Sequence, residues 1–435
     1  MQWRANHKTL AAIRDASNGD RVFGNVRLWN AGSGNLLLFA HGKKSIVSDP
    51  IDPYNRTMNT TSFKAACATG QDWQEIAGQL RTALGPEPSA ASLGLLYITD
   101  PMGPYLNNLL QTLRTGTGVR DWVGTVGGGI CYTGCEIYDE PAAVVMLATL
   151  PDDSYRLVPA GIEALSDMLE VNHNWIAEHA AHFGIVHGDP RNNHIPQLIE
   201  TLSAELNPGF LVGGLSSASD DHYQQQIAGE LYSEGLSGVL LSAAVPVISG
   251  LTQGCTPLAG KHTITRSEGN LLAELDGRPA LDVFREDIGE VLSKDLSRVA
   301  GYIFAGLPVP GSDTGDYLVR NLIGIDPNEK LLAIGDILED DAPLMFCRRD
   351  GESAREDMLR MLKDIDRRAG GQIRAGLYYS CLGRGRNQFG DNSEELKMIR
   401  DQLGDFPLVG FFANGEISHN LLYGYTGVLT LFLGE

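Results

Sequence analysis

FLVGGLSS, residues 210–217, is the stretch that decides the fold, because its pattern occurs at two other places in the chain. It reads as a hydrophobic strand with a Val-Gly pair at its centre. The same arrangement is found in WVGTVGGG (122–129) and in PLVGFFANGE (407–416). A pattern that returns at intervals predicts a structural unit used more than once.

Each copy is preceded by a strand and a helix and is followed by a further strand. The first strands are LGLLYITD (93–100), FGIVHGD (183–189) and GLYYSCLGRG (376–385). The helices that follow carry apolar residues at helical spacing: Leu106, Leu109, Leu110 and Leu113 in the first unit, and Ile195, Leu198, Ile199 and Leu202 in the second. We therefore predict an α/β fold in which repeated strand-helix-strand units form mixed sheets.

The spacing within the units supports the repeat and singles out one segment. The interval is 23 residues both from Asp100 to Val123 and from Asp189 to Val212. In the third unit, the interval from Leu382 to Val409 is 27 residues. The third copy is therefore about four residues longer, and the extra residues fall within SCLGRGRNQFG (380–390), which we call the Gly-Arg segment.

Composition restricts the class of protein. The chain has 435 residues, 43% of them hydrophobic and 20% charged, which is typical of a globular protein. Its formal charge of −20 argues against binding to nucleic acid or an anionic membrane. No segment is apolar over the roughly 18 residues of a membrane helix, no signal peptide is evident, and six cysteines are too few for a disulfide scaffold. We expect a cytoplasmic protein with reduced thiols.

The first 57 residues differ from the rest in charge. They hold eight Lys and Arg against four Asp and Glu, a net charge of +4 in a chain of −20. A methionine, Met58, then leads directly into a strand pattern. We expect the folded module to begin at Met58, and the leader to be an independent element or the result of a misplaced translation start. An ordinary N-terminal subdomain is the alternative.

The Gly-Arg segment offers the clearest candidate chemistry. It lacks the lysine of a nucleotide-binding P-loop. Gly383 and Gly385 allow exposed backbone amides, and Arg384 and Arg386 are suited to gripping a carboxylate, shortly before a helix with Ser393 as its expected N-cap. The segment predicts a site for a small carboxylate, or else a solvated turn with paired arginines.

Three further features are candidates with simpler alternatives. Nearby cations lower a thiol pKa, so Cys381 is the best candidate for a reactive cysteine, although no partner for catalysis is evident. Glu416, in a turn with Asn414 and Gly415, is suited to a ligand ammonium or is a solvated hairpin carboxylate. His187 and Asp189 lie at a strand end, where α/β proteins bind ligands. CYTGC (131–135) lacks the second ligand pair or the suitably spaced histidines of a structural zinc site.

These residues also resemble a known family. CLGRG…FG…PLVGFFANGEI resembles the end of the C-terminal half of the FIST sensory-domain family. YLVRNLIGIDP (317–327) agrees with this resemblance, as does GNLLAELDGRPAL (269–281), which resembles the junction between the two halves. FLVGGLSS and FKAACATGQDW resemble the N-terminal half. The resemblance implies an N-terminal FIST domain over 58–260 and a C-terminal one over 261–435, with the leader uncovered.

The family implies a cytoplasmic sensor of small ligands, amino acids among them, that signals through a separate partner such as a histidine kinase or a cyclase. Some members are linked to haem, for which His187, His222, His262 and His419 are the candidate ligands here. We therefore predict a sensor and not an enzyme, with haem-linked gas sensing and catalysis by Cys381 as alternatives. The predicted ligand-binding residues are Cys381, Gly383, Arg384, Gly385, Arg386, Asn414, Gly415, Glu416, Gly213 and Gly214.

Overall fold

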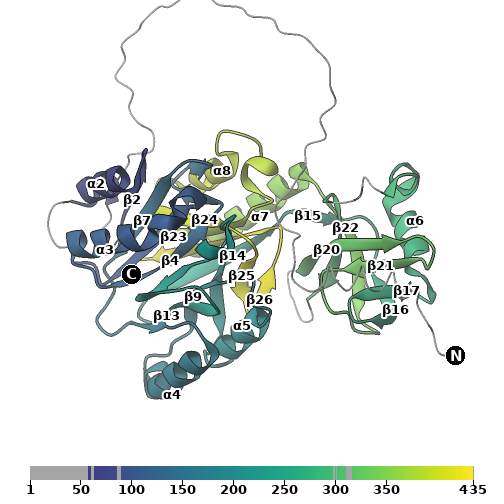
Figure 1. Ribbon diagram of the computed structural model, residues 1–435, viewed down its shortest axis with the longest axis horizontal. Helices are drawn as coiled ribbons and strands as arrows, with labels where there is room; N and C mark the ends of the chain where they lie inside the picture. The colour runs from purple at the N-terminus through teal and green to yellow at the C-terminus, as the bar shows by residue number, and fades with distance from the viewer. Residues whose placement is uncertain are drawn as a thin grey trace, which may run out of the picture.

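The computed structural model describes residues 57–59, 63–85, 90–296, 299, 301–309 and 316–434. The predicted leader lies outside these residues, apart from Thr57, which opens strand β1. Figure 1 shows two parts: a large body on the left, made from residues 57–254 and 350–434, and a smaller lobe on the right, made from residues 255–349.

The body contains three mixed sheets, one for each predicted unit. The first sheet has the order β1-β2-β7-β3-β4-β11-β12. Its strands are β1 (Thr57–Asn59), β2 (Phe63–Thr69), β7 (Ala142–Ala148), β3 (Leu93–Thr99), β4 (Asp121–Gly127), β11 (Gln226–Ala228) and β12 (Glu230–Tyr232). Helices α2 (Trp73–Leu84) and α3 (Leu106–Thr117) cover its outer face.

The second sheet has the order β26-β25-β10-β9-β13-β8 and the third has the order β14-β27-β23-β24-β5-β6. The second contains β26 (Leu421–Tyr423), β25 (Glu416–His419), β10 (Phe210–Leu215), β9 (Phe183–Gly188), β13 (Leu236–Leu241) and β8 (Tyr155–Val158), under α4 (Ile162–Glu178) and α5 (Ile195–Ala204). The third contains β14 (Val247–Gln253), β27 (Thr426–Leu433), β23 (Ile373–Cys381), β24 (Leu408–Ala413), β5 (Gly129–Tyr132) and β6 (Cys135–Tyr138), under α7 (Gly351–Ala369) and α8 (Glu394–Leu403).

The predicted repeat is confirmed by the strand pairing. In each unit the first strand and the Val-Gly strand are parallel neighbours, as β3 with β4, β9 with β10, and β23 with β24. The last strand, β7, β13 or β27, runs antiparallel to the first. The predicted leucine and isoleucine faces of α3 and α5 are buried as expected. The bare inner faces of all three sheets contribute to one shared core.

The three units exchange strands in a cycle. After its Val-Gly strand, each unit sends a short hairpin to the sheet of another unit. Strand β5 of the first unit pairs with β24 of the third, β25 of the third pairs with β10 of the second, and β11 of the second pairs with β4 of the first. The body is therefore one interlocked structure in which strands from both halves of the sequence share a sheet.

The glycine of each Val-Gly pair is required by this packing. Gly124, Gly213 and Gly410 lie opposite Leu96, Val186 and Tyr378 on the parallel neighbour, and a Cβ on any of the three glycines would overlap the carbonyl oxygen of that residue. Glycine is the residue that permits such an approach between backbones.

On each first strand, the residue that follows Leu96, Val186 or Tyr378 directs a polar side chain into the shared core. Tyr97, His187 and Tyr379 occupy equivalent places in the three units and are fully buried. The Tyr97 hydroxyl lies 2.8 Å from the Tyr379 hydroxyl and 3.2 Å from His187 Nε2. The ring of Phe411 packs against all three. Burial lowers the pKa of His187 to about 3, so its imidazole is neutral.

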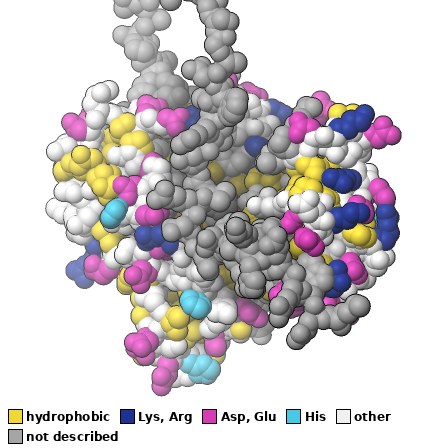
Figure 2. Space-filling view, turned by 45° about the vertical axis from the view of Figure 1, so that its right-hand side comes forward, with side chains coloured by type: hydrophobic (Ala, Val, Ile, Leu, Met, Phe, Trp, Pro, Cys, Tyr) yellow, Lys and Arg dark blue, Asp and Glu magenta, His cyan; other side chains and the backbone are white. Residues whose placement is uncertain are grey.

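The lobe is a sheet with helix α6 (Ala280–Ser293) packed against it, and it has a separate core. Its strands are β15 (Cys255–Pro257), β22 (Pro343–Arg349), β16 (His262–Glu268), β17 (Leu271–Leu275), β18 (Arg278–Pro279), β21 (Leu331–Ile334), β20 (Tyr317–Asp326) and β19 (Ile303–Pro308). Figure 2 shows basic and acidic side chains intermixed on the right-hand side of the molecule. Ion pairs of the lobe, such as Lys330 with Asp282 at 2.7 Å, follow the same mixed pattern.

We predict that Gly213→Ala destabilises the protein by about 3 kcal/mol, because strands β9 and β10 must separate to admit a methyl group. Gly78→Ala is the matched control. Gly78 lies within α2 and a Cβ there has no neighbour within 4 Å, so this substitution should be neutral or stabilising through helix propensity. Urea unfolding of both variants measures the difference, and equal free energies of unfolding would contradict the close approach.

Candidate functional site

The Gly-Arg segment connects the end of β23 to helix α8 and is folded around a buried ion pair. Arg384 is fully buried, and its Nη2 lies 2.7 Å from Oε1 of Glu395, in the first turn of α8. Arg384 Nε donates to the same oxygen at 2.7 Å, and its guanidinium lies 4.9 Å from the centre of the Phe389 ring. Two of the three guanidinium nitrogens of Arg384, Nε and Nη2, are therefore bonded to Glu395 within the protein.

Glu395 is surrounded by donors. Its carboxylate accepts hydrogen bonds from the Tyr378 hydroxyl at 2.7 Å, the Ser380 hydroxyl at 3.1 Å and the Gly385 backbone N–H at 2.7 Å. A buried ion pair is tolerated when its remaining atoms are bonded in this way. One atom of the pair is left over, because Nη1 of Arg384 is buried and has no hydrogen-bond partner.

Glu416, the first residue of the exchanged strand β25, is also fully buried. Its Oε2 accepts hydrogen bonds from the Thr426 backbone N–H at 3.0 Å and from the Thr426 hydroxyl at 2.8 Å, whereas Oε1 has no partner. Burial raises the pKa of Glu416 from 4.5 to about 8, against the lowering effect of Thr426, Arg384 and Cys381. The carboxyl group is therefore largely protonated at neutral pH.

Arg384 and Glu416 belong to one cluster. The thiol of Cys381 and the carboxyl group of Glu416 lie close enough to shift each other's pKa, and the Cys381 carbonyl accepts the Arg384 backbone N–H at 2.8 Å. Two amide oxygens close by, Oε1 of Gln388 and Oε1 of Gln253, also have no partner. Gln388 Nε2 donates to the carbonyl of Gly254, and the neighbouring Gln253 pairs in the sheet with Thr426, which bonds to Glu416. A buried donor and three acceptors are thus left unpaired in one region.

The expectation of an activated thiol at Cys381 is wrong. Burial raises the pKa of Cys381, and the neighbouring Glu416 carboxyl raises it further. The effects of Arg384 and of backbone amides, which lower it, are smaller. The sequence showed the nearby arginines, but burial of the thiol depends on the tertiary structure.

The other predicted site residues lie around this cluster in different surroundings. Arg386 is partly exposed, pairs with Asp139 and lies over the ring of Tyr138. A Cβ on Gly385 would overlap the Tyr138 hydroxyl, and one on Gly383 would lie 3.1 Å from the Tyr425 ring.

Four predicted site residues lie where β10 pairs with β25 and in the turn before β25: Gly213, Gly214, Asn414 and Gly415. The Asn414 backbone N–H donates to the Leu215 carbonyl at 3.1 Å, and the Leu215 N–H donates to Gly415 at 2.9 Å. A Cβ on Gly214 would lie 2.7 Å from that of Ala413. Protein atoms therefore fill the space beside these residues, and a ligand role for them remains a prediction.

The cluster lies at the junction between the body and the lobe, which the sequence did not indicate. Arg349, at the end of lobe strand β22, donates to the carbonyls of Gly383 and Asn387. Tyr425, next to Thr426, packs its ring 4.4 Å from that of Phe304 and donates to Asn321 at 3.1 Å. Arg349 and Tyr425 therefore connect the candidate site to the lobe.

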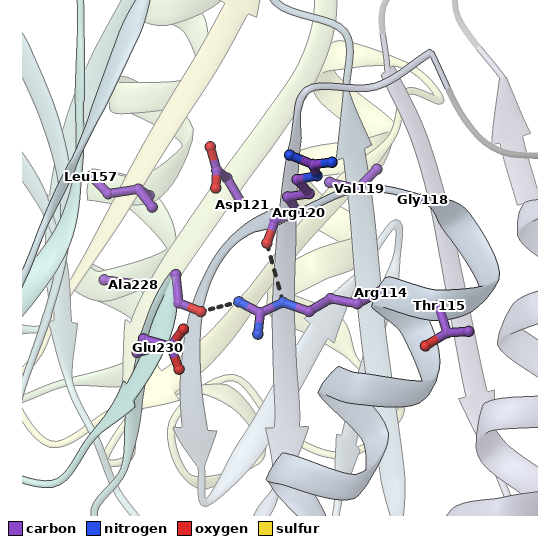
Figure 3. Close-up of a pocket in the computed structure, with 10 residues that line it drawn as sticks. Arg114, Thr115, Gly118, Val119, Arg120, Asp121, Leu157, Ala228 and Glu230 are labelled. Carbon is purple, nitrogen blue, oxygen red and sulfur yellow. Dashed lines mark hydrogen bonds between the residues drawn. The ribbon is translucent and has the colours of Figure 1, made fainter.

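Two surface cavities lie elsewhere in the body. Figure 3 shows one of about 700 Å³, in which Arg114 reaches from α3 and donates to the carbonyls of Arg120 and Gly229. The other has about 460 Å³ and lies between the starts of α4 and α5. Neither is lined by the predicted ligand-binding residues.

The histidines considered for haem are already engaged or lie at the surface. His187 is bonded to Tyr97, His262 lies between Asp276 and Asp287, and His222 and His419 are exposed. Asp189 is bonded by Arg191 at 2.7 Å. Within the described residues, no three His, Cys, Asp or Glu side chains are grouped to hold a metal ion.

Comparison with known proteins identifies the family. The model of the FIST N domain matches residues 57–278 and that of the FIST C domain matches residues 280–419. The chain belongs to the FIST family. An uncharacterized protein of Mycobacterium tuberculosis is 32% identical over 385 residues, covering 85% of this chain and 96% of the relative. An uncharacterized protein of Mycobacterium bovis is 32% identical over 381 residues, covering 83% and 95%.

FIST domains are generally sensory domains in signal transduction and are not typically catalytic. The predicted division at residues 260 and 261 stays a prediction. In the part of the chain that the structure describes, no helix has the length and apolar character needed to cross a membrane.

We predict that Arg384→Met destabilises the protein by about 3–5 kcal/mol, because Glu395 is left buried without its cation. The exposed Arg367, paired with Asp364 on α7, provides the control Arg367→Met, which should have little effect. Denaturant unfolding compares the two. A small loss for Arg384→Met would mean that the ion pair does not support the segment.

We also predict that Glu416→Gln changes how stability depends on pH. The pKa of Glu416 is raised to about 8 in the folded state, so the stabilisation from its protonated carboxyl group is complete at pH values below the ordinary pKa of 4.5. This stabilisation is lost as the pH rises from 4.5 to about 8. The variant lacks this loss, so its free energy of unfolding relative to the unmodified protein should increase between about pH 5 and pH 8. A constant difference across that range would contradict a buried, protonated Glu416.

Proposed function

We propose that this protein is a cytoplasmic sensor of a small zwitterion such as an amino acid, and that the ligand bridges Arg384 and Glu416. The observation that carries the proposal is that Arg384 Nη1 and Glu416 Oε1 are both buried and both lack a partner. Leaving a buried polar atom unpaired costs about 1–3 kcal/mol, and more when the group is charged. A ligand that satisfies both atoms recovers this free energy.

The chemistry of the two groups favours a ligand with both charges. A carboxylate accepts hydrogen bonds from Nη1 of Arg384, which has its other nitrogens committed to Glu395. An ammonium group donates to Oε1 of Glu416 and to the amide oxygens of Gln388 and Gln253. A ligand with only one of the two charges leaves either Arg384 or Glu416 unsatisfied.

The position of the site supports an output through a separate signalling protein, such as a histidine kinase or a cyclase. Arg349 and Tyr425 connect the candidate site to the lobe. A ligand that shifts the Gly-Arg segment therefore changes the contacts that orient the lobe on the body. Arg386, Cys381, Gly383 and Gly385 lie beside the site as further candidate contacts.

We predict that calorimetric titration of the full chain with the twenty common amino acids identifies at least one that binds. Arg384→Lys, which keeps a cation beside Glu395 but lacks Nη1, and Glu416→Gln should each weaken that binding at least about tenfold. Arg367→Lys and Glu170→Gln, at exposed positions, are the matched controls. Because the ammonium displaces a proton from Glu416, affinity should increase with pH up to about 8.

Two results would overturn the proposal. One is that no amino acid binds to the folded chain. The other is that an amino acid binds but its affinity is unchanged in both Arg384→Lys and Glu416→Gln, which would place the ligand elsewhere, for example in the cavity beside Arg114.

A further inference from the structure

The exchanged hairpin of the first unit makes an unusual contact with helix α8 of the third. Glu136, on β6, is buried and directs its carboxylate at the start of this helix. Its Oε1 accepts the backbone N–H of Leu396 at 3.3 Å, and the backbone N–H of Glu395 lies close enough to lower the pKa of the carboxyl group. In return, the backbone N–H of Glu136 donates to the Ser393 hydroxyl at 2.8 Å.

This contact replaces the usual capping of a helix. The first backbone N–H groups of a helix lack partners within it, and the side chain of the N-cap residue normally accepts from them. Ser393 is the N-cap of α8, as predicted, but its side chain makes no such bond and accepts from Glu136 instead. The capping acceptor is therefore supplied by a residue 257 positions earlier in the chain, from another unit.

Acidic groups outnumber basic groups in the buried surroundings of this contact. Glu136 lies near Glu395, and the buried cation beside them is Arg384, which bonds to Glu395. Tyr138 donates to Glu136 Oε2 at 2.8 Å, Cys131 lies near both carboxyl groups, and Tyr378 faces Glu395.

Arg386 lies outside this contact, over the ring of Tyr138 and paired with Asp139. The guanidinium of Arg384 is bonded to Glu395, so Glu136 lies beside a second carboxyl group without a bonded cation of its own among the described residues. Buried carboxylates that lack enough positive charge between them hold a proton more tightly.

Burial and Glu395 together raise the pKa of Glu136 to about 7, despite the bonds from Tyr138 and the helix amides, which favour the charged form. The neutral carboxyl group still accepts from Leu396 through Oε1. Ionisation strengthens these capping bonds but also adds a second buried negative charge beside Glu395, and the direction of the shift shows that the second effect is larger.

We propose that Glu136 is a proton-dependent positioning residue, which in its protonated state fixes α8, and with it Glu395 and Arg384, against the exchanged hairpin. Loss of the proton loosens the hairpin from the helix. The regulatory consequence, that pH adjusts the position of Arg384 for a ligand, rests on the proposed function. The contact and its response to protons do not depend on it.

The test is hydrogen exchange of the full chain, followed by mass spectrometry on peptides that cover β5–β6 and the first turn of α8. Opening of this contact releases a proton at pH values between the ordinary pKa of 4.5 and about 7. After correction for intrinsic exchange rates, protection should therefore fall by up to about tenfold per pH unit in that range and become constant above it.

Three variants separate this role from simple packing. Glu136→Gln keeps an acceptor for Leu396 without a titratable group, so its protection should stay nearly constant with pH and exceed that of the unmodified protein near pH 8. Ser393→Ala removes the reciprocal bond and should lower protection by the same factor at every pH. Glu140→Gln, at an exposed position beside the hairpin, should behave as the unmodified protein.

The proposal is overturned if Glu136→Gln and the unmodified protein differ by a constant factor across the pH range, or if their profiles coincide. Glu416 is present in both, so its own titration cancels in this comparison. No ligand enters the experiment. Failure of amino-acid binding would therefore leave the hydrogen-exchange result standing, and a flat hydrogen-exchange profile would leave the ligand site untouched.

Discussion

The structure depends on how closely two parallel strands approach at one glycine in each unit. At Gly124, Gly213 and Gly410 the neighbouring backbone occupies the space of a side chain. This approach brings the next residue of each first strand, Tyr97, His187 or Tyr379, into the shared core. Each sheet is covered by helices on its outer face only, so the three inner faces must be buried against one another.

The cyclic exchange of hairpins follows from the same requirement. A unit that ended at its Val-Gly strand would leave an open sheet edge, and an unpaired edge is available for pairing with another chain. Here each edge is covered by the hairpin of a different unit. The turns into these hairpins meet near the shared core, which explains why the Val-Gly strands are followed by small residues such as Gly128, Ser217 and Gly415. Ser217, for example, accepts from the Gly128 N–H at 2.8 Å.

Much of this architecture could be predicted from the sequence, because it rests on local periodicity and repetition. The buried faces of α3 and α5, the three copies and the longer third connection are visible as patterns of residues. The cyclic exchange could not be predicted, since β5, β11 and β25 are three or four residues long and their partners lie far away in the chain. The lobe as a separate part was missed for a related reason, because its strands do not follow the repeat.

The candidate site shows the same limit for charged groups. Arg384 and Glu416 were recognisable as residues suited to a ligand, and the structure places both near Cys381. Glu395 and Glu136 were not recognisable, because glutamates in a polar helix or a short strand are usually solvated. Their roles depend on burial, which the sequence does not report.

Burial also links the ligand-binding proposal to the protonation of the site. Three carboxyl groups, those of Glu136, Glu395 and Glu416, are buried in this part of the molecule, as is the guanidinium of Arg384. Arg384 is bonded directly to Glu395 and neutralises it, so Glu136 and Glu416 are left to hold protons, and both have pKa values raised towards or above neutrality. A cation that enters the site supplies the positive charge that these protons otherwise provide. Protons and a positively charged ligand group therefore act on the same excess of buried negative charge.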